Sequence, residues 1–137
     1  MNKKDIWRYK SLEQLEHKSW EPTTETEKDA VLVTGLVKRC IALSKVPVIK
    51  LTASDLRVLI GQSFNPTYLV PLAIEKLKDD LFVEADLYRG DLLKNVLDVP
   101  APFWEEHEDL HEDLKKMIKE RAVEIETEID LPGYWQS

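Results

Sequence analysis

Apolar side chains recur at intervals of three and four residues along most of this chain, the spacing that places them on one face of an α-helix. The clearest stripe predicts a helix over roughly residues 27–44 and consists of Val33, Leu36, Val37, Cys40 and Leu43. No two segments alternate apolar and polar residues as paired β-strands do. The pattern therefore predicts an all-α fold, a single-domain bundle of five to six short helices.

The 137 residues suffice for one hydrophobic core and are too few for two ordinary domains, so we expect one domain over residues 1–137. Residues 1–10 and 126–137 are the candidates for peripheral segments, and the tail EIDLPGYWQS, which ends in aromatics, either folds back on the body or frays. Hydrophobic residues make up 43% and charged residues 33%, a globular rather than a disordered composition. The single cysteine, Cys40, cannot form an internal disulfide and is expected to be a buried structural thiol.

Targeting features and net charge limit where the protein can act and what it can bind. The longest apolar-leaning run, AVLVTGLV at residues 30–37, is far too short to cross a bilayer. The opening MNKKDIWRYK has no apolar segment behind its lysines, so it is not a signal peptide, and we expect a cytoplasmic protein. The net charge of −7 argues against direct binding to nucleic acid or to an anionic membrane. It favours either a basic partner or simple solubility.

Two helix starts are marked by capping signals. Thr52, followed three residues later by Asp55, makes a capping box ahead of the apolar residues of LRVLIG. Asn65 followed by Pro66 marks a second start, because proline is favoured at the first helical position. Pro71 lies beyond the first turn and must either kink this helix or delay its start. The sequence leaves both outcomes open.

The segment LFVEADLYRG, residues 81–90, is the one irregular stretch, and it is expected to be extended or a loop. Asp91 follows it as the expected N-cap of a helix over LLKNVL. Pro100 and Pro102 open the last helical region. The apolar side of that region consists of Phe103, Leu110, Leu114, Met117 and Ile118.

Residues 107–111 read His-Glu-Asp-Leu-His, the spacing that holds zinc in metalloproteases, with His107 and His111 as ligands and Glu108 as the base. That chemistry needs one unbroken helix, a third ligand and a cleft of low dielectric. Glutamates downstream could supply the ligand, but EEHEDLHED carries almost no bulky apolar residues to bury such a site. The stretch therefore favours a solvated acidic helix, and we expect no metal and no cofactor.

Between Lys94 and Lys115 the chain carries seven carboxylates and no lysine or arginine. Acids in the first turn of a helix are stabilised by its dipole, but this explains only some of them, and the seven repel one another. The acidic stretch is either a simple solvated surface or a docking surface for a strongly basic partner. A docking surface of this kind would steer encounter and reject competitors of like charge.

Four stretches follow one another in compact order: LTASDLRVLIGQS, YLVPLAIEKL, ADLYRGDLLKNVL and PAPFWEEHEDL. With KSLEQLE and VKRCIAL, they resemble the immunity proteins of bacterial contact-dependent growth inhibition systems, in the small helical branch that carries an L-R-x-L-I-G-Q stretch. The resemblance covers about residues 10–121. The chain departs from the family pattern at FNP, which follows its G-Q stretch, and at Arg89 and Glu108, where relatives carry proline. In relatives the proline after the histidine begins a new helix, so His107 is expected at a helix junction.

The resemblance implies a binding module and not an enzyme. Such a protein captures the cognate C-terminal toxin domain of a neighbour's surface protein and blocks its active site or substrate groove. Many such toxins are nucleases, whose basic grooves suit an acidic inhibitor. The expected toxin-binding residues are Glu105, Glu106, Glu108, Asp109, Glu112 and Asp113, with Glu84, Asp86, Tyr88 and Asp91 as a second patch. For Asp91 the N-cap role is the stronger expectation, and Arg57 and Gln62 are candidates for internal hydrogen bonds.

Two other classes of protein remain as alternatives. A zinc hydrolase would use the histidines of residues 107–111 and would carry one equivalent of metal. A generic helical adaptor would protect cells against no toxin, and its partner would not be encoded beside it. A long upstream reading frame that ends in a small basic domain would favour the immunity protein over both.

Overall fold

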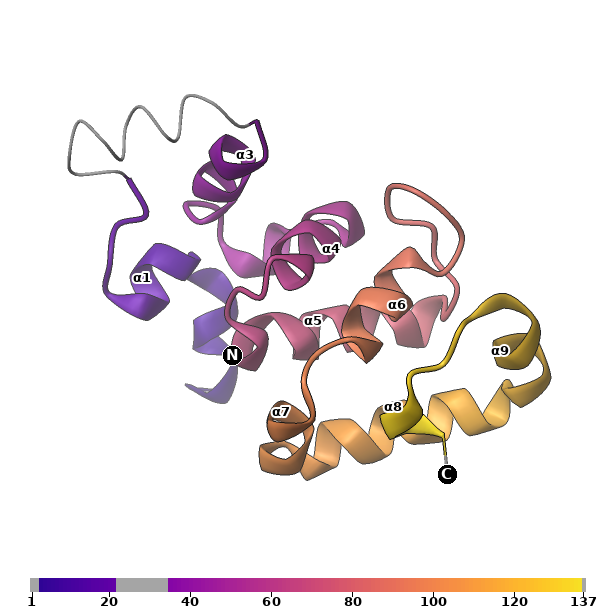
Figure 1. Cartoon of the computed structure of the whole chain (residues 1–137). Helices are drawn as coiled ribbons and strands as arrows, with labels where there is room; N and C mark the ends of the chain where they lie inside the picture. The colour runs from indigo at the N-terminus through magenta and orange to yellow at the C-terminus, as the bar shows by residue number, and fades with distance from the viewer. Residues whose placement is uncertain (1–2, 22–34, 137) are drawn as a thin grey trace. The chain divides into compact units, whose positions relative to one another are not determined.

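The computed structural model describes residues 3–21 and 35–136. The chain divides into two compact units, Met1–Leu51 and Thr52–Ser137. The described residues form eight α-helices and three short 3-10 helices, and they contain no β-strand (Figure 1). The all-α prediction is confirmed, while the assignment of both units to one domain stays a prediction.

The first unit is built from short helices. They are η1 (Lys3–Tyr9), α1 (Leu12–Glu16), α3 (Gly35–Leu43) and η2 (Val48–Lys50). The buried apolar side chains described in this unit are Leu12, Cys40, Val48 and Leu51.

The helix that the sequence predicts around Cys40 is α3. The predicted residues 27–34, Val33 among them, lie outside the described residues. Cys40 is buried as predicted, and this burial raises the pKa of its thiol. Leu36 and Val37 are exposed, although the periodicity places them on the inner face. Of the described residues of the stripe, only Cys40 is therefore buried, and Leu43 is half-buried.

The second unit contains six α-helices and one 3-10 helix. In chain order they are α4 (Ala53–Gly61), α5 (Pro66–Asp79), α6 (Asp91–Leu97), α7 (Ala101–Glu106), α8 (Glu108–Glu120), α9 (Ala122–Glu128) and η3 (Gly133–Trp135). α4 packs against α5 and α6, and α5 also contacts α8. The last helical region is divided at His107 and Arg121, so the chain has more and shorter helices than the five to six predicted.

Two of the helix starts predicted in this unit, those of α4 and α5, are confirmed. Thr52 Oγ1 accepts the Asp55 N–H at 3.1 Å, and the Asp55 carboxylate accepts the Thr52 N–H at 2.9 Å, which completes the capping box. Asn65 occupies the N-cap position of α5 with φ 35°, and Pro66 is the first helical residue. Pro71 lies inside α5, so it does not delay the start of that helix.

The C-terminal residues belong to the core of the second unit. Trp135 is buried, and its indole N–H donates to the carbonyl of Leu97 at 3.0 Å. Ile129 is buried as well. The sequence leaves open whether this tail folds back on the body or frays, and the burial of these two side chains shows that it folds back. The partner of Trp135 lies 38 positions earlier in the chain, so the contact leaves no local signal in the sequence.

Candidate functional site

The H-E-x-x-H motif crosses a break between two helices. α7 ends at Glu106 and α8 begins at Glu108, and His107 between them has the non-helical angles φ −131° and ψ 62°. The expected junction at His107 is therefore confirmed. Residues 107–111 do not form the continuous helix that a zinc protease uses to bring two imidazoles onto one metal.

Both imidazoles of the motif pack against aromatic rings. His107 stacks on Phe103 with 4.2 Å between ring centroids, and its Nδ1 donates to the Phe103 carbonyl at 2.8 Å. His111 stacks on Tyr134 at 5.3 Å and meets Trp135 edge-on at 4.9 Å. In the part of the chain that the structure describes, no three His, Cys, Asp or Glu side chains are placed to hold a metal ion together. The two histidines therefore act as packing residues.

Trp104 is the centre of this packing. It is completely buried, its indole N–H donates to the Val99 carbonyl at 3.0 Å, and its ring meets those of Phe103 and Trp135 edge-on. We call the whole group the aromatic cluster; it consists of Phe103, Trp104, His107, His111, Tyr134 and Trp135. Because the cluster joins α7, α8 and the C-terminal residues, it holds together the two helices that carry the neighbouring carboxylates.

Six exposed carboxylates lie on either side of the junction at His107. We call them the acidic face; they are Glu105, Glu106, Glu108, Asp109, Glu112 and Asp113. Glu112 pairs with Lys115 at 2.9 Å, and Asp113 pairs with Lys78 at 3.4 Å. Within the described residues the other four carboxylates form no ion pair. The structure thus brings together all six residues of the first predicted patch.

The acidic face is only partly explained by the stability of its helices. Glu108 and Asp109 lie in the first turn of α8, where the helix dipole stabilises negative charge. Glu105 and Glu106 are the last two residues of α7, where the dipole opposes negative charge. These two carboxylates therefore cost the free protein some stability, and a cationic partner would relieve that cost.

A pH dependence follows from the position of His111. Burial lowers the pKa of His111 below its ordinary value of 6.5, Lys115 adds to this, and Glu112 and Glu108 oppose it. Because the unfolded chain then binds the proton more tightly, the free energy of unfolding should fall as the pH is lowered through 6.5 towards the folded pKa. Chemical denaturation at several pH values will measure this slope. The variant His111→Phe keeps a ring against Tyr134 but cannot be protonated there, so its free energy of unfolding should depend less steeply on pH in this range. An identical slope in both proteins would show that His111 does not cause the pH dependence.

The second predicted patch is organised around a buried carboxylate. Asp91 is 1% exposed and accepts hydrogen bonds from the N–H groups of Ala85 at 2.7 Å, Asp86 at 2.9 Å and Leu87 at 2.7 Å. Burial alone would raise the pKa of Asp91, but the backbone N–H groups that face it outweigh burial, and the pKa is lowered. Asp91 therefore stays ionised and supports the loop from inside, where a partner has no access to it.

The predicted N-cap role of Asp91 is wrong. Gly90, with φ 89°, occupies the N-cap position of α6, and Asp91 is the first helical residue. A side chain at Gly90 would also approach Ile129 Cδ1 to 2.9 Å, so this turn needs glycine. Local sequence indicates a cap here, but the carboxylate is used by the preceding loop instead.

Arg57 ties the same loop to α4. Its guanidinium donates to the Asp86 carboxylate at 2.8 Å, and its Nε lies 3.7 Å from the Asp91 carboxylate. The amide of Asn95 donates to the Arg57 carbonyl at 2.9 Å, which joins α6 to α4. The expected internal role of Arg57 is confirmed. Of the second patch, Glu84, Asp86 and Tyr88 are exposed, and only Asp91 is not.

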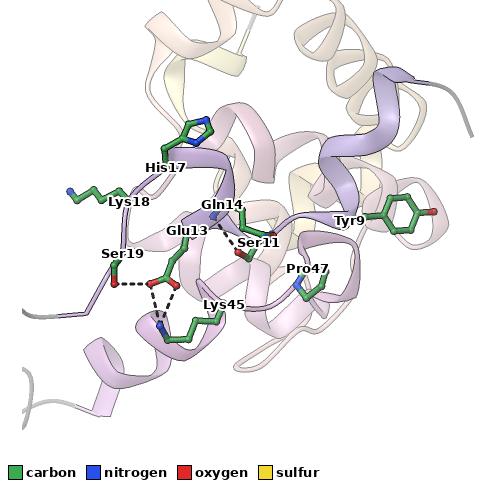
Figure 2. Close-up of a pocket in the computed structure, with 9 residues that line it drawn as sticks. All are labelled: Tyr9, Ser11, Glu13, Gln14, His17, Lys18, Ser19, Lys45 and Pro47. Carbon is green, nitrogen blue, oxygen red and sulfur yellow. Dashed lines mark hydrogen bonds and ion pairs between the residues drawn. The ribbon is translucent and has the colours of Figure 1, made fainter.

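A shallow hollow in the first unit, about 740 Å³ in volume, is shown in Figure 2. The Glu13 carboxylate lies at one side of it and accepts hydrogen bonds from the Trp20 N–H at 2.7 Å, from Lys45 Nζ at 3.2 Å and from Ser19 Oγ at 3.3 Å. The Trp20 N–H is the main cause of the lowered pKa of Glu13, and Lys45 contributes. These bonds fasten the chain after α1 to the end of α3, so Glu13 is a structural residue of this unit.

Fold and surface together define a small helical protein with an acidic face at the α7–α8 junction. The chain belongs to the family of CDI immunity proteins, those of contact-dependent growth inhibition, which matches residues 14–114. The match includes the stretch from α4 to the acidic face, and it confirms the resemblance found in the sequence. No curated protein and no solved structure matches the chain. None of the helices in the described residues has both the length and the apolar character needed to span a bilayer.

Proposed function

We propose that this protein binds and neutralises the cognate C-terminal toxin domain of a contact-dependent growth inhibition system, in a one-to-one complex. Membership of the immunity family supports the immunity role. The acidic face supports the mechanism, because four of its exposed carboxylates form no ion pair in the described part of the chain. A basic domain that docks on this face gains charge-assisted hydrogen bonds without breaking existing pairs.

A nuclease is the toxin that suits the acidic face best. Nucleases hold the phosphate backbone in a groove lined by lysine and arginine. Carboxylates clustered at the α7–α8 junction present negative charge to such a groove in place of phosphates. The bound inhibitor then blocks the active site or the substrate groove of the toxin.

This role requires binding and no catalysis, so the protein needs neither a metal nor another cofactor. It acts in the cytoplasm, where an imported nuclease meets its substrate. Its net charge of −7 disfavours contact with nucleic acid and with anionic membranes, so the toxin domain is the proposed partner. The exposed Glu84, Asp86 and Tyr88 form the second proposed contact, with Asp91 supporting them from beneath.

The proposal predicts a long reading frame beside the gene for this chain that ends in a small basic toxin domain, and the test uses that domain. Cells that produce the toxin are expected to survive when they also produce this protein, and the two purified proteins should form a one-to-one complex without nuclease activity. Survival that does not depend on this protein, or a complex that still cleaves nucleic acid, would contradict the proposal. A generic adaptor would form no such complex. A zinc hydrolase would retain one equivalent of metal after purification without a histidine tag.

A further inference from the structure

The loop of residues 83–89 projects beside α6 (Figure 1). It carries two exposed apolar side chains at its tip. Leu87 is 67% exposed and Tyr88 is 49% exposed. An antiparallel bridge between Glu84 and Arg89 closes the base of the loop. Single exposed apolar side chains are common, but these two are adjacent and form a small apolar patch that gains no core packing in the free protein. A patch of this kind on a projecting loop is a candidate interaction site.

The backbone of this loop is held unusually firmly for an exposed segment. One buried carboxylate, that of Asp91, accepts three successive loop amides, and Arg57 holds the side chain of Asp86 from the neighbouring helix. Arg89 adds a contact at the base, through an ion pair with Glu128 and a position over the Phe82 ring. A tip that is fixed before binding loses little conformational entropy when a partner covers it.

We infer that Leu87 and Tyr88 form a second docking element, which enters an apolar cleft with a cationic rim on the toxin domain. This inference rests on the proposed function. The two arginines at the loop, Arg57 and Arg89, are already paired with Asp86 and Glu128. The exposed Glu84 therefore leaves the surface around the tip negative, and a cationic rim on the partner is complementary to it, as in the basic toxin proposed for the acidic face. A tyrosine ring gives a large buried area together with a hydroxyl that hydrogen-bonds at the edge of a cleft.

The two surfaces have different kinetic roles. Carboxylates of the acidic face act over a distance and speed the encounter with the toxin, with an effect that salt screens. The side chains of the tip act only in contact, so they lengthen the lifetime of the complex. Removal of the tip side chains should therefore change the dissociation rate and leave the association rate almost unchanged.

The experiment measures association and dissociation rates of the catalytically inactivated toxin domain encoded beside the gene for this chain. The variant Leu87→Ala/Tyr88→Ala should dissociate at least about tenfold faster than the wild type, the scale of a lost aromatic contact at the centre of an interface. The matched control is Tyr9→Ala/Val123→Ala, which removes two other exposed apolar side chains. It should bind like the wild type. Far-UV circular dichroism and the midpoint of thermal unfolding check that each variant is folded. The single variant Tyr88→Ala is measured as well, as a milder change to the tip.

Each possible outcome of this experiment either supports or overturns the docking role of the loop. Faster dissociation of the tip variants with a normal control supports it. Unchanged dissociation of both tip variants, in a system where the wild type binds tightly, overturns the docking role of the loop and leaves the proposed function intact. A wild-type protein that does not bind the toxin at all overturns the proposed function, and the loop inference with it.

Discussion

Reversal of charge at Glu106 and Asp109, by the double substitution Glu106→Lys/Asp109→Lys, is expected to slow toxin association by roughly tenfold at low salt. Neither carboxylate has an ion pair to lose within the described residues. Asp109→Lys loses the favourable dipole at the start of α8 and Glu106→Lys gains one at the end of α7, so the two changes in the free energy of unfolding should largely offset each other. The difference from the wild type should shrink as salt is added, because the screening length falls from about 30 Å at 0.01 M to about 3 Å at 1 M. Association rates of both proteins, measured by surface binding at two ionic strengths, will test this salt dependence.

A control variant separates the position of the charges from the net charge. Glu120→Lys/Glu126→Lys changes the net charge by the same amount, at two exposed residues that lie outside the acidic face. It should slow association much less than the first variant does. Equal effects of the two variants, or an unchanged affinity of the first at both salt concentrations, would exclude the acidic face as the docking surface.

Replacement of Trp104 by alanine is expected to lower the free energy of unfolding by about 3–5 kcal/mol. The substitution removes a completely buried ring, its hydrogen bond to the Val99 carbonyl and its edge-on contacts to Phe103 and Trp135. Because these contacts join α7 to the C-terminal residues, the cavity cannot close without moving both. Urea denaturation followed by circular dichroism will measure the loss.

The control for this prediction is Val123→Ala, at an exposed position of α9. Its free energy of unfolding should stay within about 0.5 kcal/mol of the wild-type value. A Trp104→Ala protein as stable as this control would mean that the aromatic cluster does not hold the α7–α8 junction. The rigid presentation of the acidic face would then lose its structural basis.

The features that the sequence predicts correctly depend on neighbours along the chain. The capping box of Thr52 and Asp55 involves residues three positions apart, and Pro66 starts α5 through its own fixed φ. The all-α class follows from periodicity, which is also a short-range signal. The grouping of the acidic face could be predicted because its six residues lie within nine positions of one another.

The features that the sequence does not predict depend on contacts between distant residues. Burial of Trp135 requires the carbonyl of Leu97, which lies in another helix. Asp91 has the local signature of a cap, but three amides of the folded loop compete for its carboxylate and displace that role. The exposure of Leu87 depends on the same loop geometry. A run of mixed residues such as ADLYRG gives no indication of which of them will project.

The central claim, that the acidic face docks on the toxin, is tested most directly by carboxyl footprinting, which labels accessible Asp and Glu side chains. The free protein and its one-to-one complex with inactivated toxin are labelled side by side, and each residue is compared between them. The account predicts that Glu105, Glu106, Glu108 and Asp109 lose reactivity in the complex, while Glu120 and Glu126 keep theirs. Full reactivity of those four carboxylates in a stable complex, with protection confined to other residues, would contradict it.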